Sequence, residues 1–183
     1  MKSLIKPART TVQSGRFVAF VATSIDGRIA RDAESGTDWT SKEDWRFFQK
    51  SLAKMDAVIV GRNTYKIAEK RLRRRNTIVL TSRGKFSQSG SVFFLNPSKH
   101  NLRAFLNEKN FKKVAIVGGG QVYDYCLRHK MLDELWVTVE PYVFTGGVPM
   151  FAGEGFKKHK FVLVSAKKLN KRGTILLQYR NES

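Results

Sequence analysis

Short apolar runs alternate with amphipathic stretches along most of the chain. Runs of four to eight residues rich in Val, Ile, Leu and Phe are typical of buried strands, whereas apolar residues at spacings of three and four indicate helices. The last two apolar runs flank a basic turn that ends at Gly173, which is the pattern of a hairpin. The expected strands are 16–23, 56–60, 77–80, 91–95, 114–117, 135–139, 161–166 and 174–179, and the expected helices are 41–55, 64–72, 97–107 and 121–129.

This order of elements predicts an α/β fold. We expect a central mixed, mostly parallel sheet of eight strands, about four flanking helices and a C-terminal antiparallel hairpin. At 183 residues, of which 42% are hydrophobic, the chain has the size and apolar content of one domain. We expect that domain to cover residues 16–183 and to follow a flexible, polar N-terminal arm, residues 1–15.

The cysteine content and the length of the apolar runs indicate in which cellular compartment the protein is expected. With one cysteine, Cys126, no intramolecular disulfide can form, and a reducing compartment is expected. Cys126 lacks a His or Asp partner pattern, so we interpret it as a small buried hydrophobe. No apolar run approaches the roughly 20 residues of a membrane span. We therefore expect a cytoplasmic protein, without membrane contact and without a metal site.

The formal net charge of +19 indicates an anionic ligand or partner. A positive surface attracts nucleic acid, and it equally attracts nucleotide cofactors and carboxylate-bearing substrates. The 34 Lys and Arg residues are spread along the chain, and the dense run 70–75 (KRLRRR) lacks interleaved aromatic residues for base stacking. A small anionic ligand is therefore favoured over nucleic acid.

Three of the expected strands end in residues suited to phosphate binding. The run 114–117 leads into three glycines, 118–120, and then into a helix, which offers bare backbone N–H groups and a positive helix end. Two other strands end in the segments 61–64 (GRNT) and 81–83 (TSR). Open α/β sheets bind ligands at the carboxyl ends of their strands, so we predict a phosphate-bearing ligand there. For the glycines taken alone, a tight turn is the alternative.

The segment 26–37 interrupts the apolar pattern between the first strand and the first helix. It begins with Asp26-Gly27, a pair typical of turns, and continues through polar residues and Gly36. We therefore predict a mobile loop here, able to close over a ligand as a lid.

Asp44 lies at the edge of the apolar stripe of the first helix. Phe48 and Leu52 follow at distances of four and eight residues, and a carboxylate beside such a stripe must be paired or used. The alternative is structural, because Ser41 and Asp44 have the spacing of a capping box, where the acid also interacts with the helix dipole. The local sequence leaves both interpretations open.

Three segments together resemble the dihydrofolate reductase superfamily in order and spacing. GRNTY (61–65), IVLTS (78–82) and IVGGGQVY (116–123) are similar to its G-R-x-T-aromatic, I-I-L-S-S and I-G-G-G-x-V-Y segments. The superfamily includes the dihydrofolate reductases and the reductase domain of the riboflavin-pathway deaminase-reductases. The resemblance covers residues 16 to 180 and implies a dihydrofolate-reductase-like fold with NADPH as cofactor.

The resemblance implies that NADPH binds at these strand ends. Arg62 and Thr64 would contact the pyrophosphate, and Ser82 and Arg83 would help to bind the adenosine 2′-phosphate. A cationic cluster at that end favours NADPH over NADH. The full set of implied cofactor-binding residues is Ala22, Ile29, Gly61, Arg62, Asn63, Thr64, Thr81, Ser82, Arg83, Val117, Gly118, Gly119, Gly120, Gln121, Val122 and Tyr123.

On the substrate side, the resemblance implies that Asp44 and Thr138 are catalytic. Asp44 follows a tryptophan at the distance where dihydrofolate reductases keep the acid that binds the pterin and favours protonation at N5 while hydride arrives at C6. Thr138 matches a hydroxyl that supports this acid. Phe48 would form a wall of the substrate pocket, and the backbone of Ala22 would lie beside the nicotinamide and the substrate.

One further position matches the dihydrofolate reductases, and several segments depart from them. Arg75 stands where that family binds the carboxylate of the glutamate tail, although it also reads as one of several arginines in a solvated turn. The usual Leu-Pro before it is replaced by Leu72-Arg73. The segments 24–30 (SIDGRIA), 132–135 (LDEL) and 146–151 (GGVPMF) look more like the riboflavin-pathway reductases, but the zinc deaminase motifs H-x-E and P-C-x-x-C are missing.

We therefore expect an NADPH-dependent oxidoreductase that reduces 7,8-dihydrofolate to tetrahydrofolate. The enzymatic alternative is a pyrimidine reductase of riboflavin biosynthesis, in which the basic run 70–75 would hold the phosphate of a ribosylamino-pyrimidine substrate. The non-enzymatic alternative is a basic module that binds nucleic acid. The sequence leaves open whether the protein is a monomer or a homodimer.

Overall fold

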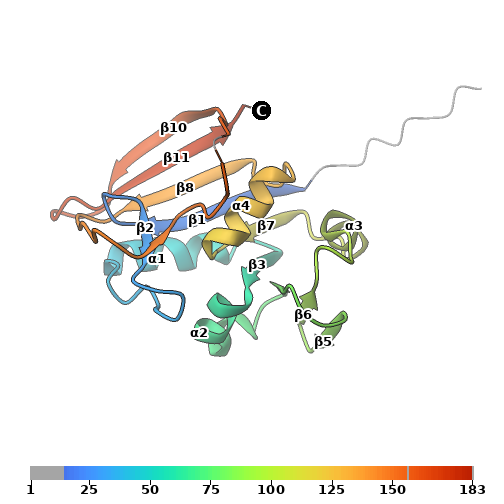
Figure 1. The fold of residues 1–183 in the computed structure, drawn as a ribbon. Helices are drawn as coiled ribbons and strands as arrows, with labels where there is room; N and C mark the ends of the chain where they lie inside the picture. Colours follow the sequence, from blue (N-terminus) through green and yellow to red (C-terminus); the bar gives the residue numbers. More distant parts are fainter. Residues whose placement is uncertain (1–14, 156, 183) are drawn as a thin grey trace, which may run out of the picture.

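The computed structural model describes residues 15–155 and 157–182, so the predicted arm 1–15 lies outside the described residues except for Gly15. Strands and helices alternate along the central part of the chain (Figure 1). The helices are α1 Lys42–Leu52, α2 Arg62–Leu72, α3 Leu102–Glu108 and α4 Gly120–Arg128. The strands are β1 Arg16–Thr23, β2 Arg28–Ala30, β3 Ala57–Gly61, β4 Thr77–Leu80, β5 Ser87–Ser89, β6 Val92–Leu95, β7 Lys113–Ile116, β8 Glu134–Val139, β9 Val148–Pro149, β10 Phe161–Lys168 and β11 Ile175–Asn181.

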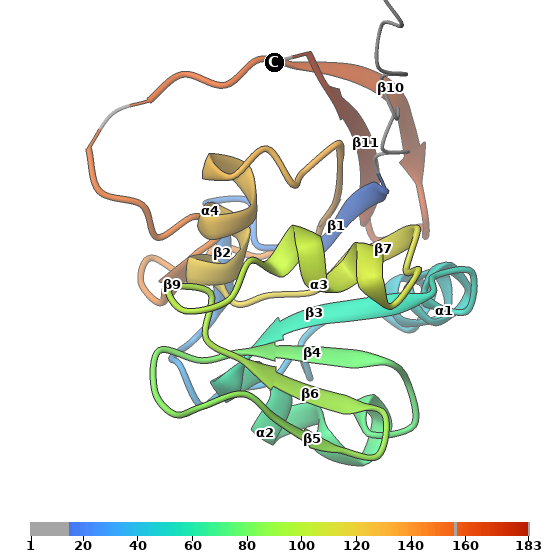
Figure 2. The ribbon, with the colours of Figure 1, turned by 90° about the vertical axis from the view of Figure 1, so that its right-hand side faces the viewer.

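Nine strands of the described chain form one sheet in the order β10-β11-β8-β1-β7-β3-β4-β6-β5. The strands from β8 to β6 in this order run parallel, so their carboxyl ends lie at one edge. Figure 2 shows β3, β4 and β6 side by side, running in one direction. β10 and β11 form the predicted antiparallel hairpin, and β11 is also antiparallel to β8. The predicted fold is confirmed.

One strand of the sheet was not predicted. β5 is polar and exposed, and it pairs antiparallel with β6 across a turn at Gly90, whose φ is +58°. An exposed polar segment carries no apolar pattern, so only its pairing partner makes it a strand.

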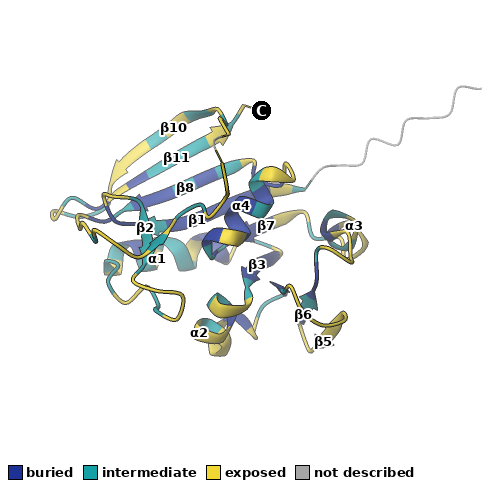
Figure 3. Ribbon diagram, in the orientation of Figure 1, coloured by how far each residue is buried: buried dark blue, intermediate teal, exposed yellow. Residues whose placement is uncertain are grey.

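The sheet separates two layers of the core, as β1 shows. Alternate side chains of a strand point to opposite faces. Phe17 and Ala19 belong to the cluster that contains residues of α3 and α4, whereas Val18 and Phe20 belong to the cluster with residues of α1 and α2. Figure 3 shows the buried residues concentrated in the central strands, while much of β10 is exposed. The central strands therefore form a buried layer whose carboxyl ends lie at one edge of the sheet.

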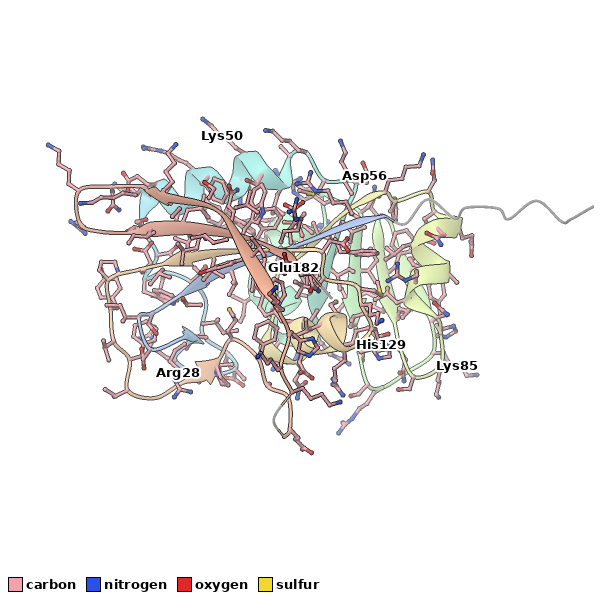
Figure 4. The ribbon with its side chains drawn as sticks, turned by 90° about the horizontal axis from the view of Figure 1, so that it is seen from above. Arg28, Lys50, Asp56, Lys85, His129 and Glu182 are labelled. Carbon is pink, nitrogen blue, oxygen red and sulfur yellow. The ribbon has the colours of Figure 1, made fainter. Side chains whose placement is uncertain are left out.

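The segment 26–37, predicted as a mobile loop, contains a strand. β2 pairs with β9, and Figure 4 labels Arg28 beside that strand. Asp26 joins the same two regions, because its carboxylate oxygens accept hydrogen bonds from the backbone N–H groups of Phe144 and Thr145, both at 3.0 Å. The first part of the predicted lid is thus held against the loop that precedes β9.

The third helix begins later than predicted. The Asn96 side chain accepts a hydrogen bond from the N–H of Ser98 at 3.0 Å and so turns the chain after β6. Asn101 then caps α3 by accepting from the N–H of Ala104, also at 3.0 Å. Two local side-chain hydrogen bonds therefore delay the helix to Leu102.

Cys126 is buried, as predicted, and burial raises the pKa of its thiol to about 12. A thiol with such a pKa is a poor nucleophile at neutral pH. Among the described residues, no three His, Cys, Asp or Glu side chains gather in a group able to hold a metal ion. No helix in the described part of the chain has both the length and the apolar content to cross a membrane.

Candidate active site

The glycine turn after β7 joins the carboxyl ends of β3 and β7. The backbone N–H of Gly61, at the end of β3, donates a hydrogen bond to the carbonyl of Gly118 at 2.8 Å. Gly118 has a φ of +109°, a conformation that favours glycine, and its peptide bond to Gly119 is cis. A Cβ at position 118 would also lie 3.3 Å from the hydroxyl of Tyr123, so there is little space for a side chain.

Two helices begin at this turn, and within the described part of the chain no side chain caps their N-termini. Gly61 is the N-cap of α2 and Gly119 is the N-cap of α4. The two starts are close together, because a Cβ on Gly119 would lie 3.7 Å from Oγ1 of Thr64 in the first turn of α2. Both helix ends carry partial positive charge and first-turn N–H groups without a side-chain acceptor. Such a pair of helix ends can bind phosphate groups.

A large open cleft of about 1700 Å³ extends from these helix ends. Its wall includes the cationic side chains of Arg62, Lys66 and Arg83. A Cβ on Gly120 would meet the carbonyl oxygen of Pro149 at 2.8 Å, so the start of α4 packs tightly against the end of β9. The predicted cofactor-binding residues that line this cleft are Gly61, Arg62, Asn63, Thr64, Thr81, Ser82, Arg83, Gly120, Gln121 and Val122.

A second pocket of about 680 Å³ meets the cleft at the glycine turn. Thr64 lines both cavities, Gly118 lines the pocket and Gly120 lines the cleft, with Gly119 between them in the chain. The predicted site residues that line the pocket are Ala22, Ile29, Asp44, Phe48, Thr64, Arg75, Val117, Gly118, Tyr123 and Thr138. The structure therefore brings all the predicted substrate residues to one pocket, together with several residues predicted for the cofactor.

Asp44 presents a buried carboxyl group to this pocket. Its side chain is 8% exposed, and the hydroxyls of Thr138 and Thr40 form hydrogen bonds with the carboxylate. Burial is the main cause that raises the pKa of Asp44 above its ordinary value, and the negative charge of Glu140 raises it further, whereas the two hydroxyls lower it. The net effect is a carboxyl group that keeps its proton to higher pH than an exposed aspartate.

The start of α1 resolves the capping-box question for the Asp44 side chain. Ser41 is the N-cap, as predicted, and its hydroxyl accepts a hydrogen bond from the N–H of Asp44 at 3.2 Å. In a capping box the acid at this position would in turn accept from the N–H of the N-cap. Here the N–H of Ser41 donates to Glu140 at 2.6 Å instead. The Asp44 carboxylate is therefore available to the pocket.

Aromatic side chains form an apolar wall of the pocket. The ring of Phe20 contacts those of Phe48 and Trp136 edge-on, with centroids 6.1 and 5.2 Å apart. Tyr123 supports this wall, because its buried hydroxyl donates to the carbonyl of Phe20 at 2.6 Å. Burial raises the pKa of Tyr123, so its hydroxyl stays neutral. An apolar wall of rings beside a buried carboxyl group suits an aromatic heterocycle with N–H groups at its edge.

Two arginines of the basic run also line the pocket. The guanidinium of Arg71 lies over the ring of Trp45, 4.6 Å from its centroid. Arg75 donates through Nη1 to the carbonyl of Leu52 at 3.1 Å. These contacts restrict both side chains, and a guanidinium held in place suits a phosphate or carboxylate.

Sequence reasoning missed several residues of the two cavities. Asn96 and Ser98 follow β6 and line the cleft, and the strand-end argument that identified residues 81–83 also applies to them. Arg71 was expected only as part of the basic run 70–75 that would hold the alternative substrate, and it lines the pocket together with Arg75. Glu140 carries no motif, and nothing local in the sequence points to its contact with Ser41.

Comparison with known proteins gives the family of the chain. A family model described as the RibD C-terminal domain matches residues 17–175. The chain belongs to the RibD C-terminal domain family. The resemblance to the dihydrofolate reductase superfamily is confirmed, because this RibD-family chain shares its fold with solved structures from both branches.

One sequence relative is the uncharacterised protein YwjB of Bacillus subtilis, which is 26% identical over 142 residues, covering 73% of this chain and 81% of that protein. The Thermotoga maritima diaminohydroxyphosphoribosylaminopyrimidine deaminase/5-amino-6-(5-phosphoribosylamino)uracil reductase has a TM-score of 0.70 and 17% identity, with coverage of 92% of this chain and 57% of that chain. Enterococcus faecalis dihydrofolate reductase complexed with NADP(H) and RAB-propyl has a TM-score of 0.64 and 22% identity, with coverage of 93% and 98%. At 17% and 22% identity, these two structures show that the chain shares their fold.

Proposed function

We propose that the protein is an NADPH-dependent reductase whose substrate is a ribosylamino-pyrimidine phosphate. The observation that carries this proposal is the junction of two cavities at the glycine turn. One cavity has cationic walls and two uncapped helix ends, and the other contains the buried carboxyl group of Asp44. The sequence motifs favoured dihydrofolate as the substrate. Membership of the RibD C-terminal domain family instead supports the pyrimidine substrate.

The larger cleft fits a dinucleotide that carries a 2′-phosphate. The N-termini of α2 and α4 offer backbone N–H groups to the pyrophosphate, and Arg62 adds a guanidinium. Ser82 and Arg83, at the end of β4, supply a hydroxyl and a cation for the 2′-phosphate. When bound, NADPH supplies a hydride. The glycine turn, which borders both cavities, is the place where its nicotinamide would face the substrate.

The smaller pocket fits a pyrimidine with an anionic tail. Asp44 would bind the N–H edge of the ring, and its raised pKa lets it hold a proton close to the reacting group. The aromatic wall of Phe20, Phe48 and Trp136 would pack beside the ring. Arg71 and Arg75 would bind the phosphate at the end of the ribosyl group. The volume of the pocket, about 680 Å³, lies within the usual range for small-molecule sites.

Dihydrofolate is the second candidate substrate, and the pairing of Asp44 with Thr138 is the observation that favours it. The two residues match the acid and the supporting hydroxyl of dihydrofolate reductases, and they hydrogen-bond to each other. In that case Asp44 would bind the pterin amino group and ring N–H, and Arg75 would bind the carboxylate of the tail.

The decay of NADPH absorbance distinguishes the two substrates. Purified protein is mixed with NADPH and either 5-amino-6-(5-phosphoribosylamino)uracil or 7,8-dihydrofolate, beside a reaction without substrate. We expect rapid oxidation with the pyrimidine and slow or no oxidation with dihydrofolate. Rapid oxidation with dihydrofolate alone would replace our proposal with the second candidate. Absence of NADPH binding would contradict both.

A further inference from the structure

Glu140 follows β8 and is a buried carboxylate without a role in the proposed reaction. Its side chain is 2% exposed. One oxygen, Oε1, accepts a hydrogen bond from the backbone N–H of Ser41, and Oε2 accepts one from the hydroxyl of Thr174, both at 2.6 Å. Burial of a carboxylate is unfavourable unless hydrogen bonds compensate it. Two such bonds from separate elements indicate a position with a specific role.

The bond to Ser41 connects Glu140 to the helix that carries Asp44. Ser41 precedes α1, and its hydroxyl holds the N–H of Asp44. Glu140 thus holds the backbone of Ser41, and the Ser41 hydroxyl in turn holds the backbone N–H of Asp44. Because Glu140 takes the N–H of Ser41, the Asp44 side chain can hydrogen-bond with Thr138 and Thr40.

The bond to Thr174 connects Glu140 to the turn of the C-terminal hairpin. Thr174 is fully buried. The side chain of Asn170 donates to Oγ1 of Thr174 at 2.9 Å and to Oε2 of Glu43 at 3.4 Å, and its own Oδ1 accepts from the N–H of Thr174 at 3.2 Å. The first turn of α1, the end of β8 and the hairpin turn therefore share one hydrogen-bond network centred on Glu140.

We propose that Glu140 is a positioning residue for Asp44, which fixes the first turn of α1 against β8 and places a second buried negative charge near the substrate acid. The effect of Glu140 on catalysis by Asp44 rests on the proposed function. The hydrogen bonds of Glu140 to Ser41 and Thr174 are independent of that function. A nearby like charge disfavours the ionised form of a carboxyl group. Burial first and Glu140 second raise the pKa of Asp44, against the effect of its two hydroxyl partners.

Other charged groups face the same pocket. Asp38 and Lys42 lie near the start of α1, and Arg71 and Arg75 come from α2 and the turn after it. The cations among them favour the ionised form of Asp44 and so oppose Glu140. Removal of the Glu140 charge should therefore leave the cations to lower the pKa of Asp44.

Site-resolved titration of carboxyl carbons by NMR tests the proposal without substrate or cofactor. Asp44→Asn identifies the Asp44 signal in the wild-type spectrum. In Glu140→Gln, which keeps an acceptor for the N–H of Ser41 but removes the charge, we expect Asp44 to titrate at lower pH than in the wild type. Unchanged titration of Asp44 in Glu140→Gln would overturn the proposal. Because no turnover is measured, failure of the proposed function would not affect this result.

Glu134→Gln is the matched control. It removes the same charge, but Glu134 lies at the start of β8, about 20 Å from Glu140 by strand geometry, and pairs with Arg16. We expect the pKa of Asp44 to be the same in Glu134→Gln and in the wild type. An equal downward shift in both variants would show a general charge effect and would also overturn the proposal.

Thr174→Val tests the positioning independently, in case Glu140→Gln does not fold. It keeps the charge of Glu140 but removes one of its two hydrogen bonds. We expect the amide of Ser41 to exchange with solvent roughly 2- to 10-fold faster, the effect of weakening one hydrogen bond. The pKa of Asp44 should stay raised. Unchanged exchange at Ser41 would show that Glu140 does not hold the start of α1.

Discussion

The hydroxyl of Thr138, on β8, hydrogen-bonds to the carboxylate of Asp44, on α1. The bond joins two elements that are distant in sequence and fixes the acid inside the smaller pocket. It lowers the pKa of Asp44, but burial of the carboxyl group has the larger, opposite effect. The pocket therefore contains an acid that is oriented by a hydroxyl and that keeps its proton to higher pH than an exposed aspartate, which suits a group proposed to transfer a proton.

Replacement of this acid should separate catalysis from cofactor binding. We expect Asp44→Asn to lower kcat by roughly 100- to 10,000-fold, the usual contribution of a general acid or base. The affinity for NADPH should change little, because Asp44 lines the smaller pocket and not the cleft. Steady-state kinetics and NADPH fluorescence titration measure the two effects. Asp38→Asn is the control, since Asp38 lines the same pocket but its side chain is largely exposed and pairs with Arg31. Equal kcat values for Asp44→Asn and the wild type would contradict the assignment.

Asp44 should also make the stability of the fold depend on pH. Its folded-state pKa lies above the value near 3.8 of the unfolded chain, so between these values the folded state holds a proton that the unfolded state has lost. The contribution of Asp44 to stability is present below this window and is lost as pH rises through it. Denaturant unfolding at a series of pH values measures this effect. As pH increases through this window, the free energy of unfolding of the wild type should decrease relative to that of Asp44→Asn. Parallel curves would contradict a raised pKa.

Loss of the Thr138 hydroxyl should shift the pKa of Asp44 upward, whereas loss of the Glu140 charge should shift it downward. Thr138→Val removes a hydrogen bond that lowers the pKa of Asp44, so we expect that pKa to increase. The pH at which kcat changes with Asp44 ionisation should increase with it, and kcat itself should fall because the acid is less well oriented. A pH–rate profile and carboxyl NMR measure both effects. A downward shift would show that the hydroxyl does not stabilise the ionised form.

The arginines of the pocket should act on the substrate phosphate. We expect Arg75→Ala to raise KM for 5-amino-6-(5-phosphoribosylamino)uracil by roughly 10- to 100-fold, the effect of losing a hydrogen bond between charged groups. Arg74→Ala is the matched control, because Arg74 is exposed and does not line the pocket. The effect of Arg75→Ala should disappear with a substrate that lacks the phosphate. The same loss in both variants would indicate a general charge effect.

A methyl group at Gly120 should weaken cofactor binding. The added Cβ would meet the carbonyl oxygen of Pro149 at 2.8 Å and displace the start of α4 from the wall of the cleft. We expect Gly120→Ala to bind NADPH about tenfold more weakly, which corresponds to about 1.4 kcal/mol. Gly146→Ala is the control, since no atom lies within 4 Å of the added Cβ there. Fluorescence titration with NADPH measures both, and equal affinities would contradict a tight contact at this turn.

The central sheet could be predicted from the sequence because its strands are continuous apolar runs. Residues 77–80 are a strand in the sequence analysis and in the structure, and both faces of β4 are buried. The pairing of β2 with β9 left no such signal, since Arg28–Ala30 is only half-buried and its partner is far away in the chain. Strands that depend on a distant partner are not visible in local periodicity.

The site was predicted in part for the same reason. Strand-end residues such as Arg62 and Arg83 follow apolar runs and could be placed at one edge from topology alone. Asp44 could not be assigned locally, because its spacing from Ser41 also fits a capping box. The partner that decides the question, Glu140, lies 99 residues after Ser41 in the chain and carries no motif.

The transfer of deuterium from NADPH to the pyrimidine tests the central claim most directly, since it requires both ligands to meet at the glycine turn. The protein is incubated with 5-amino-6-(5-phosphoribosylamino)uracil and NADPH deuterated at the transferred position of the nicotinamide, and the product is analysed by mass spectrometry. Our account predicts a reduced form of the ribosylamino-pyrimidine phosphate that carries the deuterium, together with oxidised cofactor in equal amount. NADPH that stays unoxidised in the presence of the pyrimidine, or a reduced product without deuterium, would contradict it.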